Sequence, residues 1–356
     1  MLDLLALLPL AAFVVLLVGF RQSAAVAGLA SAGLCLAIAA VSFDYPVTAT
    51  GLLGPPLEAM FTAASILWIL FPALGIYEFQ TRTGATTAIA GWLRSISSKP
   101  QIAVLLIAWF FALFLEGAAG FGTPVALVAP MLVALGIAPI KALTMALFGH
   151  AAGVSFGAVG TPIVPLLEAA AVESTALSLL IVLPHAILGA LLVFILFRLA
   201  RPDDRDRAAS WLWVPAGAFL FFVPAAALAW FTGPELPTLG GAFVGLVAFA
   251  ALAWWIQDAH TQTPPGSAAS LLRATLPYLV VLLLILLTRL IAPVADLLQS
   301  LVMGWNIGET FGGSIVPLYH PGTVLMLALI LSALFLGRSG RHLRTSFAGA
   351  AQRLPK

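Results

Sequence analysis

The sequence has very little charge for its length and almost no cysteine. Only 8% of its 356 residues are Asp, Glu, Lys or Arg, whereas 62% are hydrophobic. A soluble domain carries about 25% charged residues, so this chain lacks the polar surface that water requires. Its single cysteine, Cys35, excludes an internal disulfide and a cysteine-based metal cluster. The net charge of +2 provides no basic patch for nucleic acid. We therefore expect an all-α polytopic membrane protein that binds no nucleic acid.

The first apolar run lacks the basic residues that open a secretory signal peptide. Asp3 stands near its start, Arg21 follows only after the run, and another apolar run comes directly behind. This arrangement predicts a first transmembrane helix rather than a cleaved leader.

Long apolar runs recur along the chain at the length of about 20 residues that a helix needs to cross the hydrocarbon. The predicted spans are Leu2–Phe20, Ala24–Phe43, Ala59–Gln80, Thr175–Phe197, Trp211–Phe231, Leu239–Ile256 and Ala274–Ile291, with a shorter one at Val324–Leu336. Between the third and the fourth lies region 101–167, which is apolar but interrupted by glycine and proline. Short segments in this region bring the expected total to about eleven.

Basic residues occupy alternate connections, which predicts the orientation because Lys and Arg in short loops stay in the cytoplasm. These connections hold Arg21; Arg82, Arg94 and Lys99; Arg198, Arg201, Arg205 and Arg207; Arg273; and Arg338, Arg341, Arg344, Arg353 and Lys356. The intervening connections hold acidic residues instead, such as Glu235 and Asp296. We expect the N-terminus outside and the C-terminus in the cytoplasm, with Asp203–Asp206 in a cytoplasmic linker.

The interrupted region begins with the sequence FLEGAAGFGTPV, from Phe114 to Val125. Three glycines followed by Pro124 break the apolar pattern in the middle of a would-be long helix. The flanking pieces, Gln101–Leu115 and Thr123–Leu135, are short, since about 15 residues reach only roughly 22 Å. They are predicted to be two half-helices that meet within the membrane.

The same phrase returns about forty residues later. Phe121–Val125 reads FGTPV and Val159–Ile163 reads VGTPI. In both, Thr is expected at the N-cap and Pro at the first helical position, so each phrase predicts a helix start. Backbone leaves a helix inside a bilayer only where protein or a water-filled cavity satisfies it. Paired interruptions of this kind indicate the substrate site of a secondary transporter.

Two helix starts that point at one break are suited to an anion, because their N–H groups and dipoles favour negative charge. The candidate substrate-binding residues are Gly117, Gly120, Gly122, Thr123, Ser155, Gly157, Gly160 and Thr161. The alternative is that these small residues only let helices pack closely.

Three ionisable residues within the apolar segments are candidates for coupling or charge balance, since such groups are costly in a membrane. Glu116 and His150 precede the two breaks and are the candidate proton carriers. Arg289 is the only arginine in a predicted span and is a candidate counter-charge to the substrate. The alternatives are a hydrated helix-end Glu116, a packing His150, and an Arg289 that extends to the interface. The scattered histidines and acidic residues do not form a metal or catalytic cluster, so we expect neither enzyme activity, nor a metal, nor a cofactor.

The stretch from Phe114 to Val125, with Phe156–Gly160 and the turn Gly233–Pro237 downstream, resembles the signature region of the bacterial L-lactate permease family. The resemblance implies a multi-pass secondary transporter of the bacterial plasma membrane that imports L-lactate, and glycolate or related 2-hydroxy monocarboxylates, together with protons. It also implies inverted repeats. The chain then divides into a first repeat (1–200, with the broken-helix region 101–167), a cytoplasmic linker (201–210) and the start of a second repeat (211–356), which ends in a basic cytoplasmic tail (338–356).

Family members are longer and carry a second broken region near their C-terminus. No counterpart follows Arg338, so the comparison predicts a C-terminally truncated chain with an incomplete second repeat. The alternative to a working transporter is an inactive fragment, or a subunit whose partner chain supplies the missing repeat. A further departure is His150, where the family has small polar residues.

Overall fold

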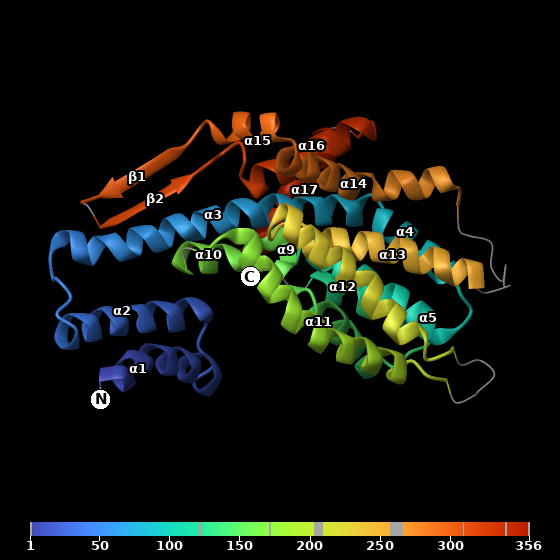
Figure 1. The fold of residues 1–356 in the computed structure, drawn as a ribbon, viewed down its shortest axis with the longest axis horizontal. Helices are drawn as coiled ribbons and strands as arrows, with labels where there is room; N and C mark the ends of the chain where they lie inside the picture. The colour runs from blue at the N-terminus through green and yellow to red at the C-terminus, as the bar shows by residue number, and fades with distance from the viewer. Residues whose placement is uncertain are drawn as a thin grey trace. The chain divides into compact units, whose positions relative to one another are not determined.

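We analysed a computed structural model of the chain, which describes residues 2–120, 123–170, 172–202, 209–256, 266–308, 310–338 and 340–354. Within these ranges the regular secondary structure is helical except for one two-stranded sheet, β1 (Met303–Ile307) with β2 (Phe311–Ile315) (Figure 1). The expected helical class is confirmed, but the hairpin was not predicted. Its Gly- and Ser-containing strands lie between two apolar helices and do not carry a helical apolar pattern.

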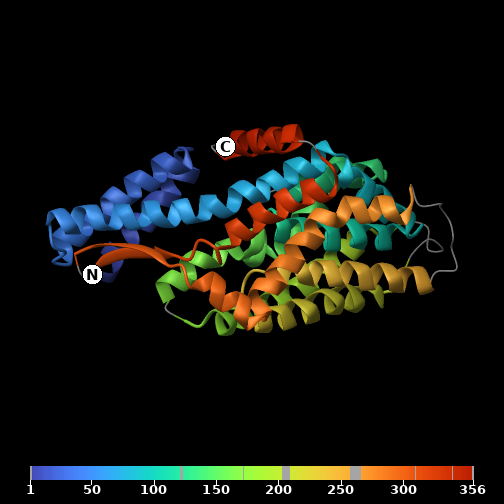
Figure 2. The same cartoon turned by 90° about the horizontal axis from the view of Figure 1, so that it is seen from above.

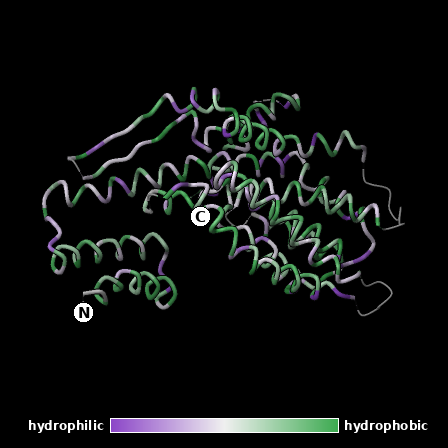
Figure 3. The backbone as a smooth tube through the Cα atoms, in the orientation of Figure 1, coloured by the Kyte–Doolittle hydropathy of each residue, from purple (hydrophilic) through white to green (hydrophobic). Residues whose placement is uncertain are grey.

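The described residues include seven helices that are long and apolar enough to cross a membrane. They are α2 (Ala24–Ser42), α3 (Ala49–Arg82), the continuous helix Pro100–Ala118, α11 (Ser174–Leu199), α12 (Trp213–Thr232), α13 (Pro237–Ile256) and α14 (Ala268–Leu290). Three shorter apolar helices cover Leu4–Gly19, Pro124–Ala134 and Pro321–Phe335. Hydrophobic residues dominate these helices (Figure 3). A polytopic membrane protein is confirmed, whereas the total of eleven segments and the repeat architecture stay predictions.

The chain forms two compact units. Unit 1 comprises Met1–Ala64 and Met303–Ser314 and holds α1 (Leu2–Val14), the π-helical turn η1 (Val15–Gly19), α2 and the hairpin. In it, the rings of Phe61 and Trp305 lie 6.0 Å apart, and the Gly312 amide donates to Glu58 Oε1 over 2.8 Å. Unit 2 comprises Ser65–Val302 and Ile315–Lys356 and holds all the candidate site residues. The predicted linker 201–210 lies largely outside the described residues, as do Arg205, Arg207 and Lys356 of the orientation argument.

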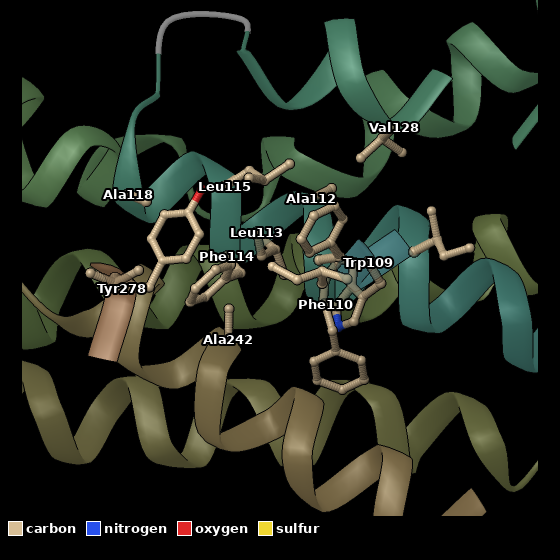
Figure 4. Packing of buried hydrophobic residues seen from close by; sticks show 14 of the residues in the cluster. Trp109, Phe110, Ala112, Leu113, Phe114, Leu115, Ala118, Val128, Ala242 and Tyr278 are labelled. Carbon is tan, nitrogen blue, oxygen red and sulfur yellow. The ribbon is translucent and has the colours of Figure 1, made fainter. Parts of the chain in front are cut away.

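Unit 2 is built around one fully buried helix, made of α5 (Pro100–Val104), the π-helical segment η2 (Leu105–Phe111) and α6 (Ala112–Ala118). Its aromatic side chains interlock with α12, α13 and α14 (Figure 4). Phe114 meets the ring of Tyr278 edge-on at 4.6 Å, and Trp109 Nε1 donates to the Gly217 carbonyl over 3.1 Å. This helix is therefore shielded from lipid, and α11, α12 and α13 lie side by side around it (Figure 1).

The first half-helix is longer than predicted, since the segment expected at Gln101–Leu115 extends from Pro100 to Ala118. The turn that contains Glu116 and Gly117 is helical, and Leu239 of α13 packs directly on it. The piece after the break is short as expected, with α7 spanning Thr123–Ala134.

The second break bends the chain by 66° between Pro139–Ala151 and Val154–Leu167. The elements in order are α8 (Pro139–Ala151), η3 (Val154–Phe156), α9 (Gly157–Gly160), η4 (Thr161–Ile163) and α10 (Val164–Ala170). If this bent pair is one span, the number of candidate spans rises to eight. An interruption at each predicted place is thus present in the structure.

The predicted basic tail contains a helix, α17 (Gly340–Arg353), that packs on the second half of α3. Glu78 of α3 accepts from Arg353 Nε over 2.7 Å and from Arg82 Nε over 2.9 Å. The rings of Phe71 and Phe347 stack at 5.6 Å, and the two helices run side by side (Figure 2). The remaining helices of unit 2 are α4 (Ala85–Ser95), α15 (Ala292–Gln299) and α16 (Pro321–Phe335).

Candidate functional site

The two interruptions meet at the carboxyl group of Glu116. This residue lies in the last turn of α6, and a methyl group added to Gly157 of the second break would overlap its Oε1. A methyl group on Gly120 of the first break would lie 3.5 Å from the same oxygen and 3.1 Å from the Ala158 amide nitrogen. Segments about forty residues apart are therefore brought together around one acidic side chain.

Glu116 is buried, with 5% of its surface exposed. Among the described residues its Oε2 has no hydrogen-bond partner. The structure thus gives no support to the alternative in which this residue is a hydrated helix end. A buried ionisable group with an unpartnered oxygen in a membrane segment is a functional candidate, because burial of such a group costs stability.

The backbone of the second break turns through three consecutive left-handed residues. Ala158, Val159 and Gly160 have φ values of 41°, 56° and 79°. A positive φ is unusual for alanine and more so for β-branched valine, and strained residues of this kind gather at functional sites. The Thr161 hydroxyl donates to the Ala158 carbonyl over 2.6 Å and thereby closes the turn.

The expected capping role of Thr161 is wrong. Gly160 is the N-cap of η4, and Thr161 is already the first residue of that turn. The left-handed conformation at the cap favours glycine, and the Thr161 hydroxyl is committed to the carbonyl behind it. In the first phrase α7 begins at Thr123, which matches the start expected for the segment Thr123–Leu135 but makes Thr123 the first helical residue rather than the N-cap. Gly122 lies outside the described residues.

The turn between α12 and α13, together with the first residues of α13, packs against both breaks. A methyl group on Gly117 would overlap the Leu239 backbone, and one on Gly160 would lie 2.6 Å from the Pro234 carbonyl oxygen. Thr238 Oγ1 donates to the Gly153 carbonyl over 2.8 Å. Thr238 was not predicted from the sequence. The one signal for it was the position of this residue next to the family-like turn Gly233–Pro237.

The candidate glycines therefore fall into two groups. Gly117 and Gly160 allow backbone to approach backbone, as the packing alternative describes. Gly120 and Gly157 lie beside Glu116, where the absence of a side chain leaves the carboxyl group room. A substrate role for any of them stays a prediction.

The two candidate polar residues near the second break have partners. Ser155 Oγ lies 2.7 Å from His185 Nε2 of α11, a histidine that was not among the predicted site residues. His150 Nδ1 lies 2.9 Å from the Ala146 carbonyl oxygen within its own helix. His185 is thus a further residue of the site region, joined to the break through Ser155, while nothing in the described contacts links His150 to Glu116.

Arg289 forms a buried ion pair with Glu235 of the α12–α13 turn, with Nε 3.0 Å from Oε1. Its Nη2 also donates to the Tyr319 carbonyl over 2.9 Å, and its Cζ lies 3.6 Å from the centre of the Tyr319 ring. The Arg289 side chain is 4% exposed and that of Glu235 13%. The charge of Arg289 is therefore paired with Glu235 in the structure, and its role as a counter-charge to the substrate stays a prediction.

No group of three or more His, Cys, Asp or Glu residues that could hold a metal ion occurs among the described residues. The groups that the site presents are backbone amides and carbonyls, hydroxyls, imidazole and one carboxyl. Such a set can bind a small organic anion and carry a proton.

Comparison with known proteins matches nearly the whole chain to one protein family. The L-lactate permease family profile matches residues 3–355. An L-lactate permease of Streptococcus iniae is 27% identical over 99% of this chain and 76% of its own length. An L-lactate permease of Bacillus subtilis (strain 168) is 33% identical over 66% of this chain, and the match spans 41% of that relative. The glycolate permease GlcA of Escherichia coli (strain K12) is 35% identical over 45% of this chain and 28% of its own length. No solved structure matches the chain significantly.

Proposed function

The chain belongs to the L-lactate permease family, and from this we propose that it is a secondary transporter of L-lactate in the bacterial plasma membrane. Glycolate and related 2-hydroxy monocarboxylates are proposed as further substrates, because a glycolate permease is among the relatives. The membership and the long apolar helices make the chain a multi-pass membrane protein. Transport, rather than catalysis, is the function that this family supports.

The observation that carries the proposal is the convergence of both breaks on Glu116. In the proposed site, a carboxylate substrate binds at the helix starts beside the two breaks, where the backbone carries partial positive charge. Thr161 closes the turn of the second break and Ser155 holds the imidazole of His185 beside it, while Gly120 and Gly157 leave space next to Glu116.

We further propose that lactate enters together with a proton that is carried by Glu116. A carboxyl group can bind a proton in one step of the cycle and release it in another, and this one lies directly at the junction of the breaks. Proton symport removes the electrical cost of importing an anion, which is about 2.3 kcal/mol per 100 mV. His150 is the second candidate for this role.

The transport proposal is tested with the full chain purified and reconstituted into lipid vesicles. With a more alkaline interior, labelled L-lactate is expected to accumulate above its external concentration, and a protonophore is expected to abolish the accumulation. Protein-free vesicles are the control for passive entry of lactic acid. Uptake no faster than in those vesicles would support the other reading, an inactive fragment or a subunit that needs a partner chain.

The orientation remains a proposal, with the N-terminus outside and the C-terminus cytoplasmic, and single cysteines test it in a Cys35→Ala background. Four short segments between the connections at Arg82 and Arg198 would place Lys141 inside and Glu173 outside. Glu173→Cys and Lys141→Cys suit this test because both side chains are exposed. An impermeant thiol reagent applied to intact cells is expected to label the cysteine at 173 and not that at 141. Permeabilised cells, in which both should react, control for accessibility, and labelling of position 141 alone would reverse the topology.

A further inference from the structure

A basic cavity of about 630 Å³ lies at the end of unit 2 that is remote from the breaks along the buried helix. It is enclosed by the end of α4, the start of α5, the connection from α7 to α8 and the end of α11. Arg94 and Lys141 line it together with Ser95, Ser97 and Ser98. Neither basic side chain forms an ion pair with any acidic residue in the part of the chain that the structure describes. The cavity thus has positive charge that the described residues leave unbalanced.

An apolar groove of about 750 Å³ lies on the neighbouring side of α4, between that helix, α13 and α14. Trp92, Phe243, Trp254 and Leu272 contribute to its lining, and none of its lining residues carries a charge. Tryptophan is enriched where membrane hydrocarbon meets the polar interface, and two tryptophans line this groove.

Ser95, the last residue of α4, lines both the cavity and the groove. The unbalanced positive charge of the cavity is therefore adjacent to the uncharged groove in a membrane-spanning unit. We propose that the two together form a binding site for one anionic phospholipid, with its phosphate at Arg94 and Lys141 and an acyl chain along Trp92 and Trp254. Basic pockets between transmembrane helices attract anionic headgroups in this way. The proposal does not depend on the transport proposal.

Two other occupants fit only one half of the feature. A soluble anion matches the charge of the cavity but would leave the apolar groove empty. An apolar helix of another chain matches the groove but leaves Arg94 and Lys141 unbalanced. The adjacency at Ser95 favours a molecule that is anionic at one end and apolar at the other.

The test uses the full chain in phosphatidylcholine nanodiscs and measures tryptophan fluorescence while lipid with brominated acyl chains is added. Brominated phosphatidylglycerol is expected to quench at low mole fraction and to saturate, whereas brominated phosphatidylcholine should quench only in proportion to its amount. The double variant Arg94→Gln with Lys141→Gln is expected to weaken the phosphatidylglycerol response roughly 30-fold, at about a factor of five for each basic group.

A matched control removes the same charge elsewhere, as Arg341→Gln with Arg344→Gln, two exposed residues of α17 that line neither the cavity nor the groove. This control should keep the wild-type phosphatidylglycerol response. The single variant Lys141→Gln changes an exposed side chain and is therefore expected to fold. It should weaken the phosphatidylglycerol response about fivefold. Equal quenching by the two lipids, an equal loss in the control, or displacement of the lipid by inorganic phosphate would each overturn the proposal.

Discussion

Glu116→Gln is expected to abolish the accumulation of lactate driven by a pH gradient while lactate still exchanges across the membrane at equal pH. Glutamine keeps the size and the hydrogen-bonding groups of glutamate, so the contacts with Gly120 and Gly157 are preserved. It cannot take up or release a proton, so the coupled step is lost. The measurement compares net uptake under an imposed gradient with counterflow of labelled lactate in the same vesicles.

The size of the effect follows from the proton gradient. One co-transported proton contributes about 1.4 kcal/mol per pH unit, so each unit of the gradient sustains about a tenfold accumulation ratio that the variant should lose. Glu173→Gln is the matched control, because Glu173 is an exposed carboxylate that caps α11 outside the site. Its pH dependence should equal that of the wild type. If Glu116→Gln itself accumulates lactate with an unchanged pH dependence, the proton travels elsewhere, and His150→Gln is the next variant to examine.

Glu235→Gln is expected to lower the free energy of unfolding by about 3–5 kcal/mol, since it leaves the guanidinium of Arg289 buried without its counter-charge. Arg289 is 4% exposed, and its other contacts, the Tyr319 carbonyl and ring, carry no negative charge. The loss is measured as the change in thermal unfolding of the purified chain in detergent, followed by tryptophan fluorescence. Asp296→Asn, which changes an exposed carboxylate in the same way, should alter stability by less than about 0.5 kcal/mol.

Removal of both charges, as Glu235→Gln with Arg289→Gln, is expected to restore more than half of the lost stability, because no unpaired charge then remains. This double variant also distinguishes a structural Arg289 from a substrate counter-charge. A structural pair predicts that the folded double variant exchanges lactate with a KM within about threefold of the wild type. If the folded double variant has a KM raised tenfold or more, Arg289 acts as the counter-charge to the substrate.

The two interruptions were predictable because they are local features. Glycine and proline act on the chain within one or two turns, so FGTPV and VGTPI each locate a break whatever surrounds them. What those residues contact was not predictable in the same way. Gly117 and Gly157 are equivalent as residues, yet one receives the backbone of Leu239 and the other the carboxyl group of Glu116. That difference depends on how separate helices pack.

By itself, the sequence determined the membrane class, most of the spans, the places of the two breaks and the family resemblance. Hydropathy and the length of each apolar segment decide the membrane class and the spans, because a spanning helix satisfies the hydrogen bonds of its own backbone. The tertiary structure alone decided that Glu235 neutralises Arg289 across 54 positions, that Thr238 closes on the second break, and that α17 packs on Glu78. Contacts of this kind arise from the packing of segments far apart in the chain, and no local pattern of residues encodes which distant atoms will meet.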